Sequence, residues 1–230
     1  TKSLENFNIT AARLDMDNLQ AYMHSGRVLV EQLVKFSPPK RKRPKILALH
    51  ASNYQTSNTL ALWKLVEKHL EGCEITEISL RNGTVTDCTG CPYTTCLHFG
   101  EQGNCIYGGV IVEQVYPAVT DCDALVMVCP NYNDAISANL AAFINRLTAL
   151  LKKTKFYDKY LFGIIVSGYS GGDIVAQQLI SGLNMNKTFI LPSRFAMMET
   201  ANKPDSLVRI PGIEQRAEAF ARNILEHVKL

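Results

Sequence analysis

Short apolar runs alternate with longer amphipathic stretches from residue 45 to the end of the chain. The runs are short enough for buried β-strands, and the stretches between them repeat apolar residues every three to four positions, as helices do. The predicted strands cover residues 46–49, 74–80, 124–129, 161–166 and 188–191. The predicted helices cover residues 59–70, 112–119, 138–151 and 173–183, and a last helix begins at Ile213. Strands separated by helices indicate βαβ units, so we expect an α/β fold with one doubly wound, five-stranded parallel sheet.

Two segments fall outside this alternation. Residues 1–37 place apolar side chains at near-helical spacing, with an interruption at Ser25-Gly26, and a Pro-Pro pair and a basic run follow. We therefore divide the chain into a helical extension with a basic linker, residues 1–44, and a main domain, residues 45–230. Residues 81–110 are rich in Gly, Cys, Thr and Asn, which predicts a long irregular excursion from the sheet.

Charge argues against a nucleic-acid partner. The chain carries 24 Lys+Arg and 21 Asp+Glu, a formal charge of +3. Five of the basic residues lie in the run at 40–45, and without them the balance is 19 − 21 = −2. The remaining surface is not basic, and no stretch approaches the roughly 18 consecutive apolar residues of a membrane span. We expect a soluble cytoplasmic protein whose partner is a small-molecule substrate, with no nucleic acid and no membrane.

Ligands of doubly wound sheets bind beyond the carboxyl ends of the strands. The turn after the first predicted strand is crowded with hydroxyl and amide side chains and leads directly into a helix, which favours a phosphate site. Its candidate residues are Ser52, Ser57, Asn58 and Thr59. The alternative is that Ser57 or Asn58 only caps that helix.

Two further turns lie at the same rim. Pro130, Asn131, Tyr132 and Asn133 follow the third strand, where an aromatic ring between amides can hold a flat heterocycle, although an ordinary Asn-rich turn is the alternative.

The turn after the fourth strand contains Gly168, Ser170 and Gly171 in a G-x-S-x-G pattern. This pattern is typical of the serine hydrolase nucleophile, but the only histidine downstream is His227, within a predicted helix. The glycines more simply let the backbone approach a ligand closely.

Three stretches together resemble the NADPH-dependent FMN reductase family, which has a flavodoxin-like fold: residues 46–58, the region of Cys88 and Cys91, and residues 129–146. The sequence Ala-Ser-Asn-Tyr-Gln-Thr-Ser-Asn-Thr at 51–59 resembles the family's phosphate turn. The sequences Cys-Pro-Asn-Tyr at 129–132 and Ala-Ala-Phe-Ile-Asn-Arg at 141–146 resemble its second signature. The similarity covers about 45–200 and implies FMN, with its phosphate at the first turn and its ring against the second and third. Tyr54 stands where the family often has an arginine.

Four of the seven cysteines are clustered, with the spacing C-x2-C-x4-C-x8-C at Cys88, Cys91, Cys96 and Cys105. Iron–sulfur flavoproteins, relatives within the same superfamily, carry a compact four-cysteine motif at this place, so a [4Fe–4S] cluster is one interpretation. Zinc and free or redox-active thiols are the others. We favour free thiols and expect no metal site.

The resemblance implies a flavin-dependent oxidoreductase in which NAD(P)H, as co-substrate, passes hydride to FMN, and the reduced flavin reduces a small molecule or an electron carrier. No side chain is assigned an acid–base role. A homodimer or homotetramer is expected, because such sites are commonly shared across a dimer in this family. The alternatives are a non-enzymatic flavin or iron–sulfur electron-transfer protein and a serine hydrolase using Ser170.

Overall fold

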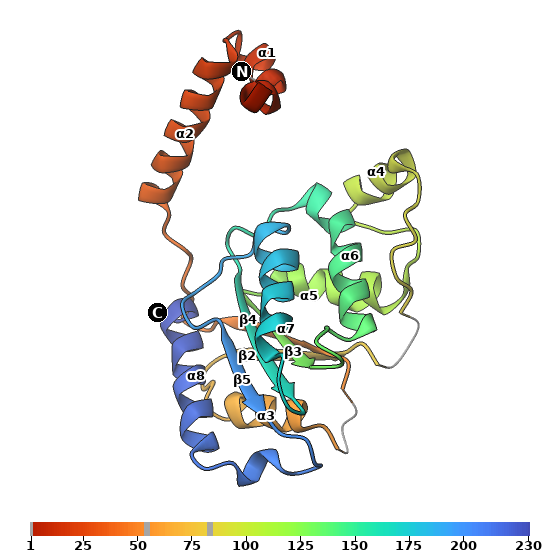
Figure 1. Cartoon of the computed structure of the whole chain (residues 1–230), viewed down its shortest axis with the longest axis vertical. Coiled ribbons are helices and arrows are strands. Elements are labelled where there is room, and N and C mark those ends of the chain that lie inside the picture. Colours follow the sequence, from red (N-terminus) through yellow and green to blue (C-terminus); the bar gives the residue numbers. More distant parts are fainter. Residues whose placement is uncertain (1, 53–55, 82–84) are drawn as a thin grey trace. The chain divides into compact units, whose positions relative to one another are not determined.

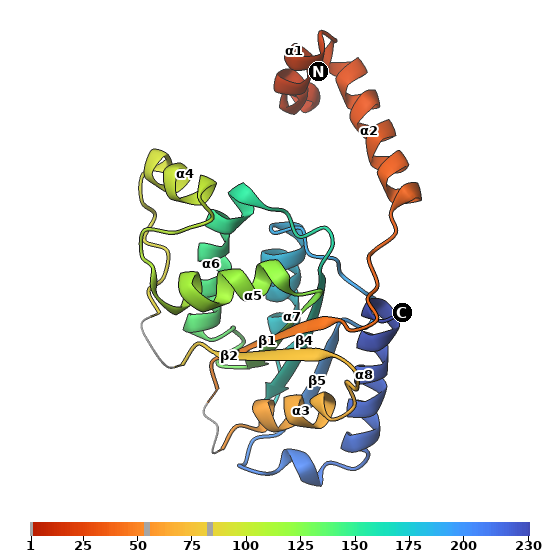
Figure 2. The ribbon, with the colours of Figure 1, turned by 180° about the vertical axis from the view of Figure 1, so that it is seen from behind.

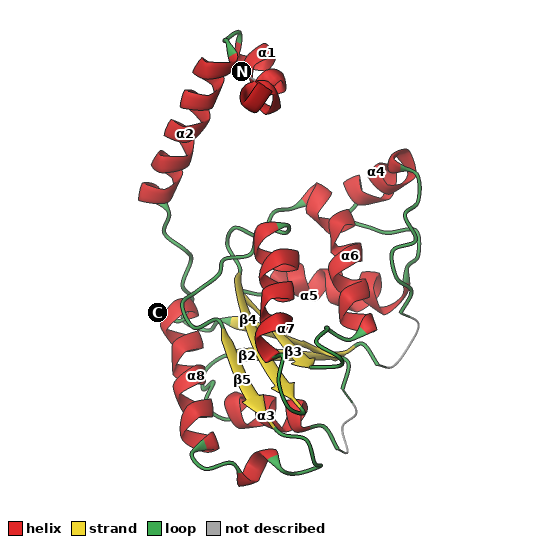
Figure 3. Ribbon diagram, viewed as in Figure 1, coloured by secondary structure: helices red, strands yellow, loops and turns green. Residues whose placement is uncertain are grey.

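The computed structural model describes residues 2–52, 56–81 and 85–230 and forms two compact units, Thr1–Pro38 and Pro39–Leu230. The second unit contains one parallel sheet with the strand order β2-β1-β3-β4-β5 (Figure 1; Figure 3). The strands are β1 (Lys45–His50), β2 (Glu74–Ser79), β3 (Ala124–Pro130), β4 (Tyr160–Ser167) and β5 (Ala196–Thr200). This order is that of flavodoxin-like folds, in which the topology reverses between the first and third strands. The predicted fold class is confirmed.

Helices cover both faces of the sheet (Figure 2). They are α3 (Asn58–Glu67), η2 (Ile111–Val115), α5 (Tyr116–Asp121), α6 (Ala138–Lys153), α7 (Gly172–Leu179), η3 (Ile180–Met185), η4 (Leu207–Arg209) and α8 (Ile213–Val228). A further helix, α4 (Tyr93–Glu101), packs on α6. The short η2 and η3 are π-helical, and η4 is a 3₁₀ turn. Helix α4 lies within the excursion that the sequence predicts to be irregular.

The sheet is buried on both faces because its strands are apolar on both. In β3, Leu125, Met127 and Cys129 pack into the core formed with α5, α6 and α7. Val126 and Val128 point the other way, into the core formed with α3 and α8. Continuous apolar strands of this kind are typical of parallel sheets.

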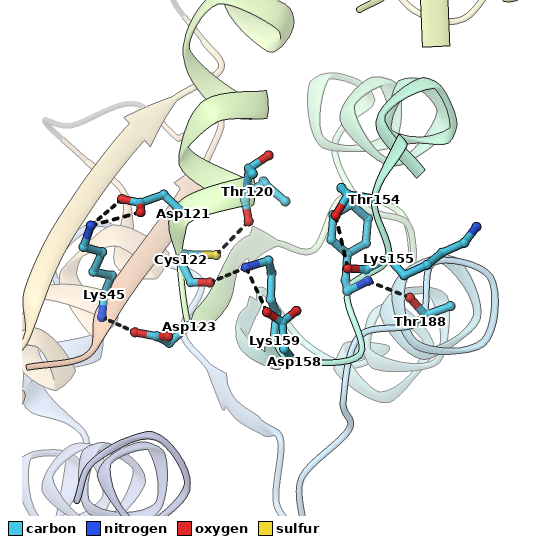
Figure 4. A network of polar contacts seen from close by, with 12 residues as sticks. Lys45, Thr120, Asp121, Cys122, Asp123, Thr154, Lys155, Asp158, Lys159 and Thr188 are labelled. Carbon is cyan, nitrogen blue, oxygen red and sulfur yellow. Dashed lines mark hydrogen bonds and ion pairs between the residues drawn. The ribbon is translucent and has the colours of Figure 1, made fainter. Parts of the chain in front are cut away.

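Ion pairs and hydrogen bonds close the amino-terminal edge of the sheet (Figure 4). Asp123, directly before β3, accepts the backbone N–H of Lys45 at 2.8 Å. Lys45 reaches Asp121 with its ammonium at 2.7 Å, and the buried Lys159 donates to the carbonyl of Cys122 at 2.8 Å. The polar groups at the starts of β1, β3 and β4 are thus satisfied by one another, which leaves the opposite rim for ligands.

The predicted position of the last strand is wrong. The fifth strand is Ala196–Thr200, and from the predicted segment 188–191 only Ile190 pairs with a strand, through an isolated bridge to Tyr160. Thr188 has a φ of +70°, which breaks an extended backbone at the point where the strand was expected to begin.

The first unit consists of η1 (Lys2–Phe7), α1 (Asn8–Leu14) and α2 (Asn18–Lys35). The expected break at Ser25-Gly26 does not occur, because α2 runs through it. The break lies instead at Asp15, which ends α1 at a φ of +53°, and at Asp17, which caps α2 by accepting from Gln20 N–H at 2.8 Å. Within the described residues, no helix is both long and apolar enough to cross a bilayer.

The amino-terminal edge gives a first prediction. The substitution Asp123→Ala should lower the free energy of unfolding by about 1–3 kcal/mol, because it leaves the Lys45 N–H without its acceptor. Urea denaturation measures this. Asp121→Ala removes an exposed ion pair at the same edge and should leave the midpoint unchanged, so equal losses in the two variants would contradict this account.

Candidate functional site

The predicted phosphate turn begins at Ser52, whose side chain lies beneath the rim after β1. Ser52 is 2% exposed, and its backbone N–H donates to Nδ1 of His50 at 3.3 Å. Its hydroxyl has no hydrogen-bond partner among the described residues. Buried hydroxyls without a partner are rare in native proteins, so this atom is a candidate ligand contact.

His50 is fully buried and supports this turn from below. Burial lowers the pKa of His50, and Glu77, whose Oε1 lies 3.6 Å from Nε2, opposes the shift only in part. The imidazole is therefore neutral at pH 7. Because Nδ1 accepts from Ser52, Nε2 carries the proton and points it toward Glu77.

Glu77 in turn is held as a carboxylate. Burial raises its pKa, but hydrogen bonds from Lys64 and Trp63, each 2.8 Å long, outweigh burial and bring the pKa below its ordinary value. This network under the first turn was not predicted, because Trp63 and Glu77 lie on different elements and read as core and surface residues in the sequence.

The structure gives the other predicted phosphate residues distinct tasks. Ser57 caps α3 by accepting from Leu60 N–H at 3.1 Å, the alternative role left open for it. Asn58 donates to the carbonyls of Ala201 and Lys203, at 3.2 and 2.8 Å, and so ties the start of α3 to the loop after β5. The first intrahelical bond runs from Ala61 N–H to Ser57. The backbone N–H groups of Asn58 and the buried Thr59 therefore face out of the helix end.

The turn after β3 is a tight hairpin. Tyr132 and Ala135 exchange backbone hydrogen bonds of 3.2 and 3.1 Å, and the two residues between them, Asn133 and Asp134, have φ of +54° and +58°. Two consecutive left-handed residues make a type I′ turn, which Asn and Asp tolerate. The ring of Tyr132 is left 57% exposed at the tip.

Asn131 joins this hairpin to the turn after β4. Its Nδ2 donates to Ser167 Oγ at 3.1 Å and to the carbonyl of Ser170 at 2.7 Å, while its Oδ1 is buried without a partner in the described residues. The structure thus brings the second and third predicted turns together, with an unused acceptor between them.

Gly171 allows this close approach. Its φ is +79°, and an added Cβ would lie 1.7 Å from Oδ1 of Asp134. Gly168 is less constrained, since its nearest neighbour would be Asn202 Oδ1 at 3.5 Å. Asp134 and Asn202 both belong to the rim and were missed by sequence reasoning, Asn202 because the fifth strand was misplaced.

The geometry does not support the serine hydrolase alternative. Ser170 lies beyond the end of β4, whereas the ring of His227 packs 5.4 Å from that of Tyr160, at the start of the same strand. Seven residues of extended chain separate the two ends by about 23 Å. The histidine that the sequence offers cannot serve as a base for Ser170.

The four clustered cysteines lie away from this rim. Cys91, Cys96 and Cys105 line a cavity of about 10 Å³ beside α6, and Cys88 faces a different pocket. Burial, and to a smaller extent the neighbouring thiols, raise the pKa of Cys96. Within the described parts of the chain, no three His, Cys, Asp or Glu side chains converge as metal ligands.

Of the predicted site residues, Tyr54 lies outside the described residues.

Comparison with known families decides the class. Residues 44–203 match the model of the NADPH-dependent FMN reductase family, which is well over half of the chain. The chain belongs to this family. The family is that of flavin-dependent oxidoreductases that use FMN. No curated protein matches the sequence.

Solved structures with the same fold support the architecture. An NAD(P)H:quinone oxidoreductase from Methanothermobacter marburgensis superposes with a TM-score of 0.57 at 14% identity, over 79% of this chain and 99% of its own. An azoreductase from Bacillus anthracis superposes with a TM-score of 0.55 at 15% sequence identity, over 79% of this chain and 98% of its own. The rubredoxin oxygen:oxidoreductase of Desulfovibrio gigas superposes with a TM-score of 0.52 at 15% sequence identity, over 80% of this chain. This chain spans only 36% of the length of that protein.

The glycine at position 171 generates a second prediction. Gly171→Ala should destabilise the protein by about 1–3 kcal/mol, because alanine would be strained at this φ and would collide with Asp134. Adding Asp134→Ala should recover part of the loss by removing the collision. Thermal unfolding of the wild type, the two single variants and the double variant measures the destabilisation and its partial recovery. Gly168→Ala is the control, because its added Cβ would make only ordinary van der Waals contacts. Full additivity of Gly171→Ala and Asp134→Ala would show that the two loops do not meet.

Proposed function

We propose that the protein is an NAD(P)H-dependent FMN oxidoreductase whose flavin binds at the carboxyl ends of β1, β3 and β4. The observation that carries the proposal is the buried hydroxyl of Ser52, which is unpartnered in the described residues and lies in the loop that leads from β1 into the amino terminus of α3. A hydroxyl donor, free backbone N–H groups and the positive end of a helix dipole are what an anionic phosphate needs.

The flavin ring would lie against the second and third turns. Pro130, Asn131, Tyr132 and Asn133 would contact one side of it, and Gly168, Ser170 and Gly171 its far edge. The Oδ1 of Asn131, which has no partner among the described residues, supports this assignment because it is an acceptor suited to a ring N–H. Ser57 and Asn58 would act indirectly, by fixing the start of α3.

FMN supplies the capacity to accept hydride from NAD(P)H and to pass it on. The protein's own contribution is position. The neutral His50 holds the Ser52 turn, Asn131 fixes two loops to each other, and Gln178 of α7 anchors the hairpin by donating to the carbonyl of Asp134 at 2.8 Å. Such preorganised contacts fix a cofactor's reactive face with no acid–base residue.

The acceptor would be a flat aromatic molecule. Tyr132 and Tyr169 expose 57% and 82% of their surface at the rim, and exposed tyrosines there can stack on a planar substrate. Quinones and azo compounds are suitable test acceptors, since two of the similar structures bear those names.

Self-association into a homodimer or homotetramer stays a prediction, which light scattering can measure. The first unit supports it, because α2 exposes apolar side chains: Leu19, Tyr22, Met23, Leu29, Val30, Leu33 and Val34.

A third prediction concerns flavin binding. Ser52→Ala should weaken FMN binding roughly tenfold, the cost of losing one hydrogen bond to a charged group. Flavin fluorescence titration measures the affinity. Ser57→Ala is the matched control: it should lower the unfolding free energy by about 1 kcal/mol through loss of the cap and change FMN affinity less. Wild-type affinity in Ser52→Ala would show that the phosphate lies elsewhere.

A fourth prediction concerns the reaction. Anaerobic addition of NADPH or NADH to the FMN-loaded protein should bleach the flavin absorbance, and a quinone or an azo dye should restore it. Tyr132→Ala should slow reoxidation by the aromatic acceptor more than reoxidation by ferricyanide, which needs no stacking. A flavin that both nicotinamides leave oxidised, but that dithionite reduces, would favour the electron-transfer alternative.

A further inference from the structure

A second polar pocket lies beside α6 and η3, away from the flavin rim. It has a volume of about 430 Å³, and its walls combine one cation, four neutral polar side chains and one thiol. These lining residues are Lys187, Asn145, Thr148, Ser181, Asn186 and Cys88. A volume of this size accommodates a small metabolite.

Lys187 is the unusual member of this set. It is only 5% exposed, and within the described chain its ammonium donates to a single partner, the amide oxygen of Asn186. Among the described residues no carboxylate lies close enough to Lys187 to raise its pKa, and none lines the pocket. Burial lowers the pKa of Lys187, with no neighbouring acid to oppose the shift. A buried cation without an anion is costly, so such groups are normally paired.

The acidic residue nearest in sequence to the pocket wall is already engaged. Asp87 accepts from Asn145 Nδ2 at 3.0 Å and from the backbone N–H of Cys88 at 2.6 Å. These hydrogen bonds lower the pKa of Asp87, and its carboxylate does not line the pocket. Because Asp87 neither lines the pocket nor acts on the pKa of Lys187, it does not serve as the counter-charge of this lysine.

The backbone around Lys187 is fixed in an unfavourable conformation. Thr188, the next residue, has a φ of +70°, which is rare for a β-branched side chain. Its hydroxyl accepts from Phe156 N–H at 2.9 Å, and Asn184 donates to the carbonyl of Phe189 at 2.6 Å. These bonds hold the turn that carries Lys187, so the lysine has not simply been left in the interior by a loose loop.

The helices that line the pocket are also closely packed against each other. Gly182 of the π-helical η3 packs on Ile144 of α6, and an added Cβ would lie 2.9 Å from its Cγ2. Asn145 lies seven residues after the start of α6, which is about 10 Å along the helix axis from the rim. Ser181 lies nine residues after the start of α7, which is about 14 Å from the rim along that axis. The pocket is thus separate from the proposed flavin contacts.

We propose that this pocket binds the oxyanion group of a small metabolite, a phosphate or a carboxylate, with Lys187 as its counter-charge and the hydroxyls and amides of Thr148, Ser181 and Asn186 as further hydrogen-bond partners. Only an incoming anion completes the pairing that the described residues leave open. The assignment does not depend on the flavin function.

The test uses the FMN-loaded protein, so that the flavin's own phosphate fills the rim. Inorganic phosphate and succinate are titrated separately at constant ionic strength, and amide NMR shifts of Ser181, Gly182 and Lys187 are followed. One of the two anions should give a saturable shift at these amides that chloride does not, and which anion does so identifies the group. Lys187→Met should weaken that binding tenfold or more, because the charge is lost.

Two controls make the outcome decisive. Lys153→Met removes an exposed cation from the end of α6 and should leave binding unchanged. Without added anion, Lys187→Met should unfold at a higher temperature than the wild type, since an unpaired buried charge is replaced by an apolar chain. If Lys187→Met fails to fold, Lys187→Gln takes its place in the titration. No saturable shift with either anion, or wild-type affinity after removal of the charge, would overturn the proposal.

Discussion

The structure depends on a sheet that is buried on both faces. Once helices cover both sides of β3 and β4, a polar group in this unit can meet a ligand only at the ends of the strands or between the covering helices. The amino-terminal end is closed by Asp123, Lys45 and Lys159, which satisfy one another and nearby carbonyls. The carboxyl end instead gathers loops whose groups are partly unpartnered within the described residues, and this asymmetry, more than any single motif, supports the flavin site that we propose at that rim.

Most of the sheet and its covering helices could be predicted from the sequence, because they follow from the local spacing of apolar residues. Four strands and the helix of 138–151 follow directly from periodicity, as the burial of Leu140, Phe143 and Leu147 shows. The fifth strand could not be found in this way, since an edge strand with the sequence Ala-Met-Met-Glu-Thr is half polar, while the apolar segment before it is broken by the left-handed Thr188. Periodicity does not report a single residue's φ.

The residue types of the candidate site could be predicted from the sequence, but the separate role of each residue could not. Hydroxyl and amide residues after β1 signal an anion site. A sequence cannot show that Ser57 caps a helix, that Asn58 holds the loop after β5, and that the hydroxyl of Ser52 is buried without a partner among the described residues. For Asn58 this role depends on tertiary contacts with residues 143 and 145 positions away. The same holds for His50, whose neutral form is set by burial and whose tautomer is set by Ser52 and Glu77.

Unsatisfied polar groups link the two binding sites proposed for this chain. Ser52 and Lys187 are both buried residues. Within the described residues the Ser52 hydroxyl has no hydrogen-bond partner, and the Lys187 ammonium has a neutral partner, Asn186, but no anion. Each lies where the backbone is tightly constrained, Ser52 by the buried His50 and Lys187 by the strained Thr188. A protein that only needed stability would gain by replacing either group with an apolar one. Keeping both is consistent with selection for ligands that satisfy these groups, at a cost to the stability of the unliganded protein.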